Sequence, residues 1–140
     1  MVGRNPFGRP FPARTFGRGV VLGHLRTATF VFIALLFLFP PLTALAYGGV
    51  VLLVAIAYSF LTDRLGVRRS GPRWTLLRWT IDQAVLLFVV STACFLLYNA
   101  FRDWSVLSWR VLLYITVPTV AVGLIPIVFS GMAVQMRAER

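Results

Sequence analysis

The sequence DRLGVRRSGPR at residues 63–73 separates two long apolar halves of a 140-residue chain. It contains four of the fourteen arginines, and Arg78 follows closely. Trp74 and Trp79 follow the stretch, as expected for an interfacial aromatic anchor. Gly66 and the run Ser70-Gly71-Pro72 are turn formers, and proline is acceptable at the first position of a new helix. The stretch therefore predicts a basic loop that joins two helical hairpins.

The composition on either side of this loop is that of a membrane protein. Hydrophobic residues make up 59% of the chain and charged residues 13%, whereas globular domains carry about 25% charged residues. The length allows one domain. The net charge is +10, and every basic residue is an arginine. Because the arginines cluster at the ends of apolar runs, they indicate anionic lipid headgroups as the partner and argue against direct nucleic-acid binding by these residues.

Four apolar runs predict an all-α integral membrane protein with four transmembrane helices in two hairpins. About 20 helical residues cover a hydrocarbon core of about 30 Å. The expected spans are residues 20–39, 42–61, 76–99 and 111–134. Pro40-Pro41 is expected to stop the first helix and to form the tight turn before the second. The four-helix domain covers residues 27–134, and residues 135–140 form a tail.

Residues 1–26 form a basic arm before these helices. Five arginines alternate there with prolines and with Phe7, Phe11 and Phe16. We expect an arm on the membrane surface, with its phenylalanines in the headgroup region; a disordered tail is the alternative. Together with Ala44-Leu45-Ala46, the arm also resembles a signal peptide. Its long basic region and the apolar run that follows at once favour an uncleaved span.

The placement of the arginines predicts the orientation. Twelve lie in the arm, in the central loop with its flank, and in the tail, whereas Arg102 and Arg110 lie between the last two spans. By the positive-inside rule, both termini and the central loop face the cytoplasm.

Few residues in the spans are suited to chemistry. Asp82 is the acidic residue closest to membrane depth, and Arg78 lies one helical turn before it, which predicts an interfacial polar pair. A signalling or gating role and a proton relay are the alternatives for Asp82. His24 and Cys94 are the sole residues of their types, so a disulfide or a Cys/His metal pattern is not expected. We expect no enzyme activity, cofactor or metal site.

Two spans carry features of helix packing and bending. Small residues stand four apart in the second span, a spacing that permits close helix contact. These pairs are Ala44 with Gly48 and Ala55 with Ser59. The last span contains Pro118, Gly123 and Pro126, and each proline leaves a carbonyl one turn earlier without its helical donor. A fixed packing kink and a movable hinge are both open interpretations.

Short motifs along nearly the whole chain resemble a known family. They are Arg9-Pro10-Phe11-Pro12, Phe37-Leu38-Phe39-Pro40, Tyr98-Asn99, and residues 119–129 with their Val-Gly-Leu-Ile-Pro core, which lead to Gln135 and a charged exit. Together they resemble the four-helix membrane region at the N-terminus of some bacterial LytTR-type transcription regulators. In that family the last membrane helix leads into a DNA-binding domain, whereas this chain stops at Arg140.

The resemblance implies a sensory or sequestering role in the bacterial inner membrane. We expect a non-enzymatic regulatory protein, either the membrane input module of a LytTR-type regulator or a separate membrane partner of one. Its contact surface for headgroups or a cytoplasmic regulator is expected at Arg64, Arg68, Arg69 and Arg73. Homo-oligomers are also expected. The alternatives are a small oligomeric transporter or channel subunit and a structural membrane-assembly subunit.

Overall fold

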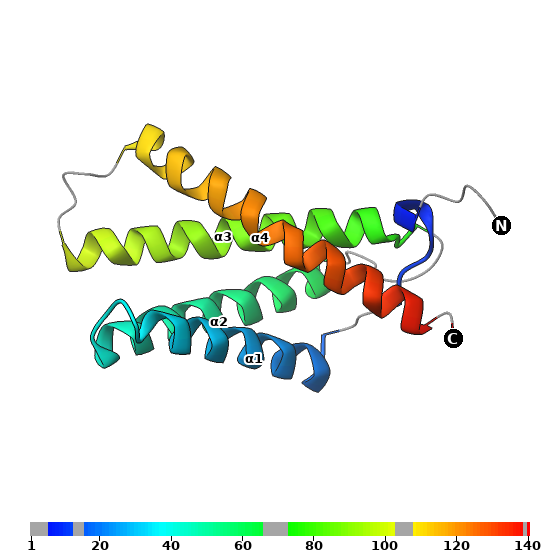
Figure 1. Ribbon diagram of the computed structural model, residues 1–140, viewed down its shortest axis with the longest axis horizontal. Coiled ribbons are helices and arrows are strands. Elements are labelled where there is room, and N and C mark those ends of the chain that lie inside the picture. The colour runs from blue at the N-terminus through cyan, green and yellow to red at the C-terminus, as the bar shows by residue number, and fades with distance from the viewer. Residues whose placement is uncertain (1–5, 13–15, 66–72, 103–107, 139) are drawn as a thin grey trace.

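Four long helices make up most of the protein. The computed structural model describes residues 6–12, 16–65, 73–102, 108–138 and 140. The helices are α1 (Arg18–Leu35), α2 (Pro41–Arg64), α3 (Leu76–Phe101) and α4 (Trp109–Ala138), and a 3₁₀ turn, η1 (Pro6–Gly8), lies in the arm (Figure 1). All four helices are long and apolar enough to cross a membrane. The predicted all-α class with four such helices is therefore confirmed, and it indicates a multi-pass membrane protein.

The turn between α1 and α2 begins earlier than the sequence indicated. α1 ends at Leu35, whereas the first span was expected to reach residue 39. Phe39 precedes Pro40, and Pro40 precedes Pro41; a residue before proline is disfavoured in the helical conformation. Pro41 itself begins α2, where its missing N–H costs no helical hydrogen bond.

Polar side chains cap the starts of the other two helices. The Thr75 hydroxyl accepts a hydrogen bond from the Arg78 backbone N–H at 3.4 Å, and the Ser108 hydroxyl accepts one from the Val111 N–H at 3.2 Å. Such caps satisfy N–H groups that have no partner within the helix. α4 then continues through its internal prolines to Ala138, so part of the predicted tail is helical.

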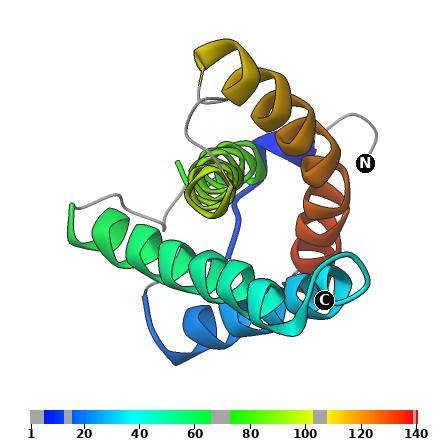
Figure 2. The same ribbon diagram turned by 90° about the vertical axis from the view of Figure 1, so that its left-hand side faces the viewer.

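Each helix packs against the next one in the sequence. The starts of α1 and α3 and the ends of α2 and α4 lie at one end of the molecule, which we call the arm end; the α1–α2 turn marks the opposite, turn end (Figure 1). α4 crosses α3 obliquely, and its Trp109 end lies apart from the α1–α2 pair (Figures 1 and 2).

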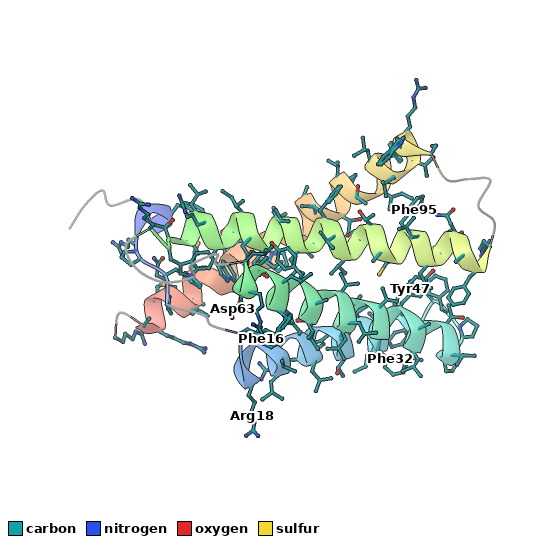
Figure 3. The ribbon with its side chains drawn as sticks, turned by 180° about the vertical axis from the view of Figure 1, so that it is seen from behind. Phe16, Arg18, Phe32, Tyr47, Asp63 and Phe95 are labelled. Atoms are coloured by element: carbon teal, nitrogen blue, oxygen red, sulfur yellow. The ribbon has the colours of Figure 1, made fainter. Side chains whose placement is uncertain are left out.

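The α1–α2 contact depends on small side chains. A Cβ atom at Gly48 would lie 3.2 Å from the Phe32 Cβ and 3.5 Å from the Ala28 carbonyl oxygen. Phe32 lies on α1 next to α2 at this level (Figure 3). The small residues that the sequence singled out in α2 are all buried. They are Ala44, Gly48, Ala55 and Ser59. Their spacing therefore did mark a helix-packing face.

Large apolar side chains cover the outside of the helices. Phe30, Leu53, Val122 and Phe129 are each about two-thirds exposed. An apolar surface this extensive is unusual for a water-soluble monomer and matches the surface that a membrane protein presents to acyl chains. Trp109 is also exposed, at the start of α4, where an indole suits the boundary between headgroups and hydrocarbon.

Candidate functional site

A buried aromatic cluster joins three segments at the arm end. We call Phe11, Trp74, Leu76 and Trp79 the arm-end cluster; side chains from η1 and from the second half of α4 pack against it. The Phe11 and Trp79 rings stack with their centroids 4.9 Å apart and their planes 20° from parallel. Phe11 is 4% exposed and Trp79 is 6% exposed. The arm, the start of α3 and the end of α4 therefore share one core.

The arm is also fixed by its backbone. The Phe11 N–H donates to the Trp74 carbonyl at 2.8 Å, and the Leu76 N–H donates to the Arg9 carbonyl at 3.4 Å. These bonds form an isolated antiparallel bridge between Pro10 and Thr75. Proline restricts the preceding residue to extended conformations, which suits a segment that pairs in this way.

α4 reaches the arm through a buried glutamine. The Gln135 side-chain N–H donates to the Pro10 carbonyl at 3.3 Å, and Gln135 is only 4% exposed. Proline has no N–H to pair with, but its carbonyl is a full acceptor. This hydrogen bond connects residues 125 positions apart in the sequence. It ties the last turns of α4 directly to the N-terminal arm.

Gly131 sets how closely α4 approaches α3. A Cβ atom at this position would overlap the Trp79 ring and would lie 2.9 Å from the Leu76 Cδ1 atom. The space that a side chain would need is therefore already filled by the arm-end cluster. Any residue other than glycine at position 131 must push α4 away from the cluster or displace the Trp79 ring.

Polar contacts join the helices beside this cluster. The Tyr58 hydroxyl on α2 donates to the Asp82 carboxylate on α3 at 2.9 Å. The His24 Nε2 atom on α1 lies 2.7 Å from the Ser59 hydroxyl on α2. Interhelical hydrogen bonds of this kind stabilise membrane bundles by about 1 kcal/mol each.

A small cavity of about 20 Å³ lies among these polar groups. His24, Ser59, Asp82 and Gln83 line it, together with the two tryptophans of the arm-end cluster and two aliphatic side chains. This volume is sufficient for about one water molecule. Within the described residues, the indole N–H groups of Trp74 and Trp79 have no hydrogen-bond acceptor.

The predicted polar pair lies one turn apart near the start of α3. Arg78 is exposed, whereas Asp82 is half-buried, and its carboxylate contacts Tyr58 of a different helix. The pairing of Arg78 with Asp82 stays a prediction. Sequence spacing could suggest a partner for Asp82 only on its own helix, so the Tyr58 contact was missed.

The predicted hinge residues are spread along α4. Pro118 and Pro126 are exposed and lie inside the continuous helix. Gly123 faces α3, where an added Cβ would lie 3.2 Å from the Leu87 Cδ1 atom. Gly123 and Gly131 are thus two points at which α4 approaches α3 closely. Whether the prolines act as a hinge stays a prediction.

The predicted contact surface is described only in part. Arg64 is exposed at the end of α2, with its guanidinium 5.3 Å from the centre of the Phe60 ring, and Arg73 is exposed before α3. Arg68 and Arg69 lie outside the described residues. The surface therefore has two described arginines at the arm end, one on each side of the central loop.

Aromatic residues expected at the lipid headgroups are instead buried in the protein. Phe11 was expected to dip into the membrane surface and Trp74 and Trp79 to anchor at the interface, yet all three are in the arm-end cluster. Phe16 contacts the Phe60 ring of α2 edge-on, with centroids 5.5 Å apart. An aromatic residue beside an arginine gives the same sequence pattern whether its ring lies among lipid headgroups or in a protein core. Only the fold distinguishes the two locations.

The site has the chemistry of a structural junction. Among the residues that the structure describes, no group of three or more His, Cys, Asp or Glu side chains lies together. Comparison with known proteins finds no matching family model, curated protein or solved structure. The class of protein is therefore defined by the four helices that are long and apolar enough to cross a membrane.

Replacing Gly131 by alanine is expected to release the arm. The added methyl group would overlap the Trp79 ring, and overpacking of this kind costs about 1–3 kcal/mol. Trypsin should then cut within the arginine-rich arm faster than in the unaltered protein. Gly23→Ala is the matched control, because nothing lies within 4 Å of a Cβ at Gly23. Equal cleavage rates in both variants and in the unaltered protein would contradict the proposed packing.

Proposed function

We propose that this chain is a non-enzymatic regulatory membrane protein that passes a signal from the bilayer to cytoplasmic machinery. It would act as the membrane input module, or as the membrane partner, of a LytTR-type transcription regulator. The supporting observation is that one buried cluster ties together the arm, the start of α3 and the end of α4. A displacement of α4 would therefore be transmitted to the arm and to the start of α3.

The proposal places the arm end at the cytoplasmic face of the bacterial inner membrane. Its support is the distribution of arginine, which is concentrated on the arm-end side of the spans. A phosphatase reporter that is active only outside the cytoplasm is expected to be inactive when fused after residue 140 and active when inserted within residues 102–110. The opposite pattern would reverse the orientation and remove the cytoplasmic output.

α4 is the element proposed to move. Pro118 and Pro126 each remove one backbone hydrogen bond within it, which lowers the resistance of the helix to bending at those positions. The arm end of α4 is held through Gly131 and Gln135. A change in bend between the prolines and this attachment would alter the Gln135–Pro10 and Gly131–Trp79 contacts. The arm would then be released from, or drawn toward, the helices.

The output surface is proposed to be basic. Arg64 and Arg73 are exposed at the arm end, beside the central loop. Anionic headgroups attract such arginines, with about 1 kcal/mol for each basic residue near the surface. An acidic patch on a cytoplasmic regulator would compete for the same arginines. Release of the arm, which brings further arginines, would change the outcome of that competition.

The experiment compares gene expression in bacterial strains that differ only in this chain. A strain without the chain is expected to show a discrete set of altered transcripts, and the unaltered chain should restore them. Gln135→Leu should fail to restore them, because it removes the hydrogen bond to Pro10. Met136→Leu is the control at an exposed neighbouring position. Amounts of each variant in the membrane must be equal.

An unchanged transcript profile in the strain without the chain would contradict a regulatory function. Full restoration by Gln135→Leu would contradict the role of the α4–arm link in that function. The two results are independent, since the first tests regulation itself and the second tests only the route proposed for it.

A further inference from the structure

A second hollow, far from the arm-end cluster, lies near the turn end. It is a cleft of about 490 Å³, within the size range of small-molecule sites in proteins. All four helices contribute to its lining, including Val31 of α1, Tyr47 of α2, Phe95 of α3 and Ile115 of α4. Figure 3 shows the labelled Tyr47 and Phe95 near this end of the molecule. Most of the lining is apolar, with a few hydroxyl groups.

The course of α4 explains why the cleft is present. Glycines bring α4 close to α3 at Gly123, at the middle of α4, and at Gly131, toward its arm end. The Trp109 end of α4 is carried away from the α1–α2 pair by the oblique crossing (Figure 2). The cleft therefore lies where the turn-end part of α4 diverges from α1 and α2. The cleft is a consequence of how the helices cross.

Three hydroxyl groups that line this cleft have no hydrogen-bond partner within the described residues; they belong to Tyr47, Ser91 and Tyr98. The Tyr47 side chain as a whole is only 7% exposed, whereas Tyr98 is 38% exposed. Inside a bilayer, water is not at hand to replace the missing partner, so a hydroxyl without an acceptor is costly there. The other lining hydroxyl on α4, that of Thr119, already donates to the Ile115 carbonyl at 2.7 Å.

We propose that the cleft binds a membrane-soluble molecule with an aliphatic chain and a carbonyl oxygen. The aliphatic chain would fill the apolar part, which in a membrane is open to other acyl chains. The carbonyl oxygen would accept the hydrogen bond that Tyr47 offers, with Ser91 as a second donor. Both side chains are donors that a simple hydrocarbon cannot satisfy. The carbonyl is thus what distinguishes the occupant from any alkane.

Two sources can supply this chemistry. The first is a phospholipid of the bilayer, whose ester carbonyl would sit at Tyr47 while one acyl chain enters the cleft. The second is a free molecule, such as a fatty ester, that reaches the cleft through the membrane. The role of this binding as a signal rests on the proposed regulatory function. A molecule bound between the α1–α2 pair and α4 would change the angle at which α4 crosses α3. Its binding can be measured without any regulatory readout.

The test uses the chain in nanodiscs and a methyl palmitate that carries a photoreactive diazirine in mid-chain. In discs of ether-linked phospholipid, which have no ester carbonyl, crosslinks are expected to concentrate on the cleft segment around Ser91 and Cys94. Unlabelled methyl palmitate should reduce them several-fold, and hexadecane should not. Tyr47→Phe should lower the crosslink yield at least about threefold. Tyr114→Phe, which alters a tyrosine that is 82% exposed, is the matched control.

The same measurement in ester-linked phospholipid separates the two sources. Lower crosslink yield there than in ether-linked discs means that bilayer phospholipid occupies the cleft and supplies the carbonyl. Equal yield in both means that the free fatty ester is preferred. The proposal is overturned if crosslinks spread evenly over lipid-facing residues, if hexadecane competes as well as methyl palmitate, or if Tyr47→Phe behaves like Tyr114→Phe. None of these outcomes depends on gene regulation.

Discussion

The contact between Gly131 and the Trp79 ring is the constraint on which the rest of the structure depends. Acyl chains are as apolar as leucine, so membrane helices gain little from burying apolar side chains against one another and associate through close packing and hydrogen bonds instead. Gly131 permits that closeness for α4, and Phe11 stacks on the same ring at 4.9 Å. One indole therefore serves as the contact surface for both a helix and the N-terminal arm.

This junction determines how the two ends of the molecule differ. At the arm end, aromatic packing, the Pro10–Thr75 bridge and the Gln135 hydrogen bond hold three segments together. At the turn end, the helices surround a cleft in which the Tyr47 hydroxyl has no hydrogen-bond partner within the described residues. A molecule bound in that cleft would act on α4 at one end, and the arm-end cluster would respond at the other. The proposed input and output are thus joined by a single helix.

The sequence predicted the helices well because long apolar runs have few alternatives to a membrane span, and it also located the small-residue face of α2 at Gly48. The predictions from the sequence were wrong where a lipid surface and a protein core can accept the same aromatic side chains. Phe11, Trp74 and Trp79 resemble interfacial anchors by pattern, yet they are buried inside the protein. The Tyr58–Asp82 and Gln135–Pro10 contacts join segments distant in the sequence, and no local spacing reveals such pairs.

The most direct test of the coupling between arm and α4 is a distance measurement by double electron–electron resonance. Spin labels at Gly8 and Met136, both exposed, would report on the arm and on the end of α4, with the single native cysteine replaced by Cys94→Ala. An arm fixed to the arm-end cluster predicts one narrow distance distribution in lipid. A broad distribution, as expected of an arm that moves freely over the membrane surface, would contradict the account.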